Sequence, residues 1–145
     1  MNNTSVENKI PNDAKAYAKE LTTFYHNIPG ATSTDPETRR YVKQAYESLK
    51  NNPRAFKAFD NLFDALVFAA FSSEADGVIE LPAPENGAQY AVIGDIPTAL
   101  VAGARMVVAW DHIYEAYEAV TGKPSPISRI SLNDEGDTTD TIEEV

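Results

Sequence analysis

The side chains whose types and spacing could serve chemistry are concentrated between positions 111 and 118. Glu115 follows Asp111 by four residues and His112 by three, and Glu118 follows Glu115 by three, which places the four side chains on neighbouring faces of one helix. Carboxylates and imidazole can hold a divalent cation, and Asp64 of a preceding helix could contribute if it faced them. However, the ferritin-like pattern needs glutamate before histidine on two helices, whereas here the order is reversed and occurs once. We therefore interpret the segment as a solvated helix face and predict no metal or cofactor. A metal site at Asp64, Asp111, His112 and Glu115 is the alternative.

The sequence lacks the motifs of several other kinds of catalytic or binding site. The chain has no cysteine, which excludes disulfides, thiolate metal sites and cysteine nucleophiles. No glycine-rich phosphate loop and no GxSxG nucleophile motif occurs. His26 lies at the predicted carboxy-terminal end of a helix, where the helix dipole favours a positive charge. Its position therefore needs no catalytic role to explain it. We therefore expect a protein that is not an enzyme.

A second group of candidate residues is basic. Arg39, Arg40 and Lys43 could face nucleic acid or an acidic partner, but without a helix-turn-helix pattern we expect direct nucleic-acid binding to be absent. Tyrosines suit protein interfaces because they combine an aromatic body with a polar tip, and Tyr114 and Tyr117 flank the acidic group. The predicted interaction residues are therefore basic, acidic and aromatic: Asp111, Glu115, Glu118, Tyr114, Tyr117, Arg39, Arg40 and Lys43.

The net charge of −10 is distributed unevenly along the 145 residues. Residues 1–60 carry +2, residues 61–133 carry −6, and residues 134–145 carry another −6. The acidity therefore belongs to the carboxy-terminal part and to a separate tail, for which the composition predicts disorder.

Apolar periodicity predicts the elements that must position these residues. Steps of three and four residues indicate helices over 12–28, 34–50, 53–72 and 95–121. Short apolar runs at 78–81 and 90–93 indicate two strands, joined by a proline-rich connection that is too long for a two-residue turn. The predicted fold is mainly α (α+β): about a four-helix bundle with a small β-hairpin between the third and fourth helices.

The expected organisation is a flexible start (1–11), one helical domain (12–132) and an acidic tail (133–145). No stretch reaches the roughly 18 apolar residues of a membrane span, and no signal-peptide pattern opens the chain. We expect a cytoplasmic protein that has no membrane contact.

Three functional hypotheses remain open. The first is a non-enzymatic interaction module, an adaptor or inhibitor that binds a protein partner through a helical, partly acidic surface. It could be encoded by a phage or mobile element, and it includes an inhibitor that mimics nucleic acid. The second is a structural subunit of a larger assembly such as a virion or connector, in which the chain would oligomerise. The third is a small metal-dependent enzyme.

Overall fold

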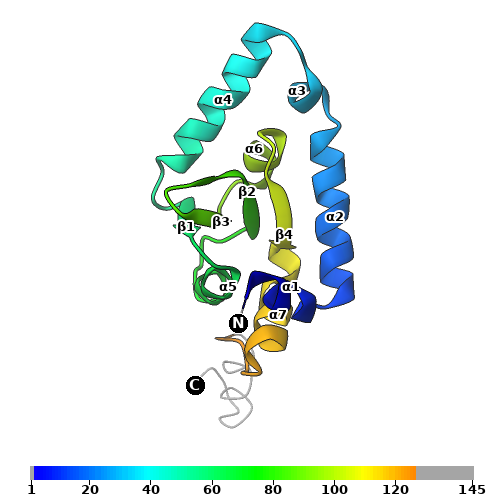
Figure 1. The fold of residues 1–145 in the computed structure, drawn as a ribbon, viewed down its shortest axis with the longest axis vertical. Coiled ribbons are helices and arrows are strands. Elements are labelled where there is room, and N and C mark those ends of the chain that lie inside the picture. Colours follow the sequence, from blue (N-terminus) through cyan, green and yellow to red (C-terminus); the bar gives the residue numbers. More distant parts are fainter. Residues whose placement is uncertain (1, 127–145) are drawn as a thin grey trace, which may run out of the picture.

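A computed structural model describes residues 2–126 of the chain, and Figure 1 shows its fold. Over this range the chain forms seven α-helices, one short 3-10 helix and four strands. In chain order the elements are α1 (Asn3–Lys9), α2 (Asn12–His26), α3 (Pro29–Thr32), α4 (Pro36–Lys50), β1 (Phe56–Phe59), α5 (Leu62–Ala70), β2 (Gly77–Glu85), β3 (Ala88–Ile93), α6 (Ile96–Val101), β4 (Arg105–Ala109), η1 (Trp110–His112) and α7 (Ile113–Thr121).

The four strands form one antiparallel sheet in the order β1-β3-β2-β4. β2 and β3 make a hairpin in which Glu85 pairs with Ala88, so that only Asn86 and Gly87 form the turn. Both turn residues have positive φ, 51° and 84°, which is the conformation that an Asn-Gly pair favours between twisted strands. The prediction of a longer connection between the strands is wrong, because β2 continues through the proline-rich segment as far as Glu85.

Helices cover both faces of the sheet (Figure 1). One face buries Val78, Val92 and Val108 against α1, α5 and α7, and the other buries Ile79 and Ile93 against α2, α4 and α6. Alternate strand residues point to opposite faces. Since both faces are covered, the strands appear in the sequence as continuous apolar runs instead of an alternation of apolar and polar residues.

The prediction of a four-helix bundle with a single hairpin is therefore wrong. The first two predicted helices are present as α2 and α4, but the third is divided into β1 and α5. The division falls at Asp60-Asn61, where the Asn61 side chain accepts a hydrogen bond from the Asp64 amide and caps α5. Residues 56–59 instead pair with β3 at the sheet edge.

The fourth predicted helix is also divided, into α6, β4, η1 and α7. Gly103, with φ of +113°, lies in the connection that ends α6. The β-branched pair Val107-Val108 follows in β4, and this residue type favours a strand. An apolar run that is buried on both sides has no period that distinguishes a strand from a helix. For this reason the prediction of one continuous helix over 95–121 is wrong.

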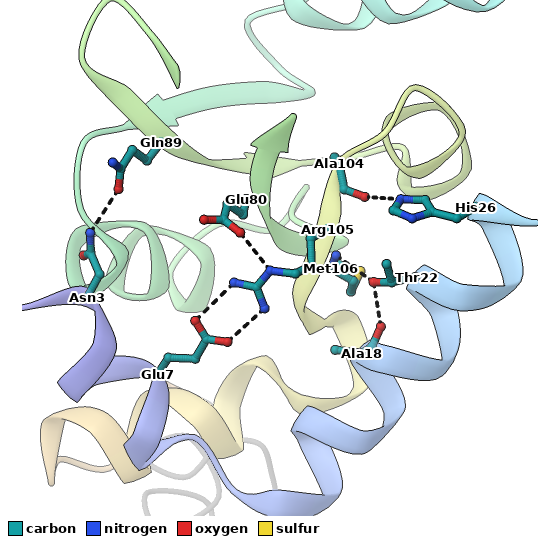
Figure 2. A network of polar contacts seen from close by, with 10 residues as sticks. All are labelled: Asn3, Glu7, Ala18, Thr22, His26, Glu80, Gln89, Ala104, Arg105 and Met106. Carbon is teal, nitrogen blue, oxygen red and sulfur yellow. Dashed lines mark hydrogen bonds and ion pairs between the residues drawn. The ribbon is translucent and has the colours of Figure 1, made fainter. Parts of the chain in front are cut away.

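Polar contacts attach the amino-terminal helices to the sheet (Figure 2). Arg105 at the start of β4 donates two hydrogen bonds to the Glu7 carboxylate of α1, at 2.9 and 3.2 Å, and one to Glu80 of β2 at 2.8 Å. The hydrogen bonds that Arg105 donates to Glu7 and Glu80 raise its pKa above the usual range for arginine. α1 also buries Val6, and Ile10 that follows it is buried, so residues 3–10 belong to the folded body.

Two contacts hold α2 along β4. Thr22 accepts a hydrogen bond from the Met106 amide and donates one to the Ala18 carbonyl, both at 2.9 Å. His26 Nε2 donates to the Ala104 carbonyl at 2.9 Å. His26 therefore has a structural role in connecting the end of α2 to the beginning of β4 (Figure 2).

Within residues 2–126 no helix combines the length and the apolar character that crossing a membrane requires. The predicted acidic tail lies outside the described residues.

Candidate functional site

Two surface hollows lie at opposite ends of the short helix α6. The first meets its amino-terminal end at Ile96 and Pro97, and the second meets its carboxy-terminal end at Val101 and Ala102. We call them the acidic hollow and the basic hollow, after the charged side chains that line each of them. The acidic hollow has a volume of about 360 Å³ and the basic hollow about 540 Å³.

The acidic hollow lies between α2, α6 and η1. Its lining combines aromatic and apolar side chains with three aspartates: Tyr17, Leu21, Tyr25, Asp76, Gly94, Asp95, Ile96, Pro97, Ala109, Trp110 and Asp111. No basic residue belongs to this lining. The hollow therefore presents aromatic rings and negative charge together.

Trp110 is the most distinctive side chain of the acidic hollow. It is the single tryptophan of the chain, and 64% of it is exposed. It follows the buried strand β4 and begins η1, so the fold holds its backbone firmly while the indole lies at the surface. Large exposed aromatic side chains of this kind are typical of binding surfaces, where burial by a partner removes them from water.

The three aspartates of the acidic hollow differ in how the fold uses them. Asp95 caps α6 and accepts hydrogen bonds from the Thr98 amide at 3.1 Å and the Thr98 hydroxyl at 2.8 Å. Asp76 and Asp111 are exposed, and neither carboxylate has a hydrogen bond or ion pair within residues 2–126. These two negative charges are therefore available to a ligand.

Beside the acidic hollow, α2, η1 and α7 bring together one group of side chains that could hold a metal: Asp13, His112 and Glu115. His112 Nδ1 lies 2.9 Å from Glu115 Oε1 and 4.0 Å from Asp13 Oδ2, and the His112 ring contacts the edge of Tyr17 at 5.6 Å between centroids. These three potential ligand atoms lie within 4.8 Å of one another.

The same three residues have a structural explanation. Asp13 and Glu115 lie in the first turns of α2 and α7, where the helix dipole stabilises negative charge. When Nδ1 carries a proton, His112 donates it to Glu115, and binding a metal through this nitrogen would break that hydrogen bond. The group can accordingly stabilise the contact between the two helices without an ion.

The structure places the other predicted acidic and aromatic candidates in different surroundings. Tyr117 is buried and contacts Phe71, whereas Tyr114 is exposed. Glu118 accepts a hydrogen bond from the Ser125 amide at 2.8 Å. Asp64, the predicted alternative metal ligand, accepts a hydrogen bond from the Asn61 side-chain amide, and its own backbone amide donates one to Asn61 Oδ1. It does not belong to the His112 group.

Arg39, Arg40 and Lys43 are brought together by the fold. All three line the basic hollow, which α3, α4 and the end of α6 enclose. The complete lining is Gly30, Ala31, Ser33, Arg39, Arg40, Val42, Lys43, Tyr46, Val101 and Ala102. No acidic residue belongs to it, although the chain as a whole carries a net charge of −10.

Three important residues of the acidic side were not predicted from the sequence. The helix predicted over 95–121 contains Trp110 in its interior, and Asp76 belongs to none of the predicted groups of site residues. Asp13 is separated from His112 by 99 positions, so no local spacing could have connected the two. The detectable signal was the single tryptophan, placed where an apolar run meets Asp111 and His112.

Comparisons of the chain with protein-family models, with curated proteins and with solved structures found no match.

Proposed function

We propose that the protein is a non-enzymatic interaction module whose acidic hollow binds a basic segment of a partner protein. The observation that carries this proposal is the position of Trp110, exposed beside Tyr17 and Tyr25 in a lining that contains aspartates and no basic residue. A tryptophan face attracts a lysine or arginine side chain, with a strength of about 0.5–2 kcal/mol depending on how far the pair is desolvated.

The carboxylates support the same class of ligand. Asp76 and Asp111 have no side-chain partner in the described part of the chain, so a bound ammonium or guanidinium group could pair with them without breaking an existing contact. A partner side chain that enters the hollow would meet an aromatic surface and an opposite charge together. This combination favours lysine or arginine over apolar and acidic residues.

The experiment is a selection of peptides from a random library displayed on phage, performed on the full chain and on Trp110→Ala. We expect the full chain to enrich peptides rich in lysine and arginine. We expect Trp110→Ala to lose these peptides, because tryptophan is enriched among the interface residues whose truncation costs about 2 kcal/mol or more.

Tyr41→Ala is the matched control. Tyr41 is 72% exposed, similar to Trp110, but it does not line the acidic hollow. This variant should select the same basic peptides as the full chain. Selection of peptides without an excess of basic residues, or unchanged selection by Trp110→Ala, would show that the proposed function is wrong.

A further inference from the structure

The basic hollow concentrates positive charge on a protein that is strongly acidic. Three basic side chains and no acidic one line it, while the chain carries −10 overall. A long polyanion such as nucleic acid would meet repulsion from the rest of the molecule. A small anion would experience mainly the local field of the hollow.

Two of the three cations are not neutralised by the fold. Arg40 forms a long contact of 3.8 Å with Glu37, and both side chains are largely exposed. Arg39 and Lys43 make no hydrogen bond or ion pair within residues 2–126. They are four residues apart on α4, an arrangement in which like charges destabilise a helix. Two positive charges without a polar partner among the described residues therefore lie on one helix at the edge of the hollow.

The remaining lining adds polar groups and an apolar wall. Ser33 contributes a hydroxyl group, and Val42, Val101 and Ala102 contribute apolar surface. Tyr46 also lines the hollow, and its buried hydroxyl has no hydrogen-bond partner in the described part of the chain. The volume of about 540 Å³ falls within the range of about 300–1,000 Å³ that is usual for small-molecule sites.

We infer that the basic hollow is a binding site for a small organic phosphate. The planar guanidinium of Arg39 can donate two parallel hydrogen bonds to phosphate oxygens, and the Lys43 ammonium supplies a further point charge. The apolar wall of Val42 and Val101 would contact the organic part of the ligand. This site is separate from the acidic hollow, so it stands or falls independently of the proposed function.

The test is a titration of the full chain with phenyl phosphate, followed by two-dimensional amide NMR. We expect the amide signals of Gly30 and Ala31 to shift, and phenyl phosphate to bind more tightly than inorganic phosphate because its ring meets the apolar wall. In the double variant Arg39→Gln with Lys43→Gln, affinity should fall at least about tenfold, because two charge-assisted hydrogen-bonding groups are lost.

The control is the double variant Lys57→Gln with Lys123→Gln. It removes the same charge from two exposed lysines that do not line the basic hollow, and it should bind phenyl phosphate as the wild type does. Equal losses in the two double variants would overturn the inference, as would an absence of shifts at Gly30 and Ala31. Tighter binding of a single-stranded oligonucleotide, lost in Arg39→Gln with Lys43→Gln, would also overturn it in favour of a nucleic-acid surface.

Discussion

The acidic and basic hollows share α6 but differ in how the fold treats their charged groups. In the acidic hollow, one of three carboxylates caps α6 and so contributes to the fold. In the basic hollow, Arg39 and Lys43 make no hydrogen bond or ion pair within residues 2–126. The comparison shows that a charged residue lining a hollow can have a structural role, as Asp95 has, or can lack any polar partner in the described structure, as Arg39 and Lys43 do.

The largest expected effect comes from damaging the element that both hollows share. Leu100 of α6 is fully buried, so Leu100→Ala should lower the free energy of unfolding by about 2–5 kcal/mol. Urea denaturation measures this loss. In the fraction that remains folded, binding of both a basic peptide and phenyl phosphate should weaken, because each hollow has a wall on α6.

Leu66→Ala is the control for this experiment. Leu66 is equally buried, but it lies on the opposite side of the sheet in α5. It should produce a similar loss of stability while leaving both ligand affinities of the folded protein unchanged. If Leu100→Ala weakened the binding of only one ligand, α6 would not support both hollows.

A smaller effect is expected when the free carboxylates of the acidic hollow are neutralised. Asp76→Asn with Asp111→Asn should reduce the affinity for a basic peptide by about 0.5–2 kcal/mol, since each exposed charge contributes modestly. The remaining affinity should depend less on salt, because fewer charges are screened. Fluorescence of Trp110 during the peptide titration provides the measurement, as the chain has a single tryptophan.

Glu20→Gln with Asp60→Asn removes the same charge outside the acidic hollow and serves as the comparison. Unchanged salt dependence in Asp76→Asn with Asp111→Asn would mean that the aromatic side chains alone bind the peptide. The contrast of charge between the two hollows would then have no functional meaning.

The smallest effect concerns Tyr46, which lines the basic hollow. Its buried hydroxyl has no partner among the described residues, so Tyr46→Phe should increase the free energy of unfolding by about 1 kcal/mol. Burial also raises the pKa of Tyr46. Because the folded state holds this proton more tightly than the unfolded state, wild-type stability should fall relative to Tyr46→Phe as the pH rises above about 10.

Thermal unfolding of the two proteins at neutral and at alkaline pH measures both parts of this prediction. A loss of stability in Tyr46→Phe would contradict the first part and would show that the hydroxyl has a stabilising partner. The Tyr46 hydroxyl would then not be a free hydrogen-bonding group of the basic hollow.

The sequence predicted helices α2 and α4 correctly because each has a buried face of limited width and polar residues on the other side. It failed for β4, since Met106, Val107 and Val108 are buried on both sides of the sheet and have no amphipathic period. The strand predicted at 78–81 is present as the first part of β2, but the continuation of β2 to Glu85 was not predicted. Pro82 and Pro84 suggested a loop, but they lie beyond the part of β2 that pairs with β4, where a proline is tolerated.

The two candidate sites could be predicted from the sequence to different degrees, because the charged residues of one lie on a single helix and the residues of the other come from distant segments. Arg39, Arg40 and Lys43 lie on one helix, so their spacing alone placed them near one another. The acidic hollow combines α2, the end of β3, α6 and η1, and no local pattern predicts which distant residues meet Trp110. Contacts between distant segments depend on the sheet order, which the sequence interpretation did not contain.

The most direct test of the account is an amide and indole NMR titration of the full chain with a selected basic peptide and, separately, with phenyl phosphate. We predict that the peptide shifts the Trp110 indole signal and leaves Gly30 and Ala31 unchanged, and that phenyl phosphate does the reverse. Shifts of the same signals by both ligands, or movement of Trp110 by phenyl phosphate alone, would contradict the assignment of opposite ligands to the two hollows.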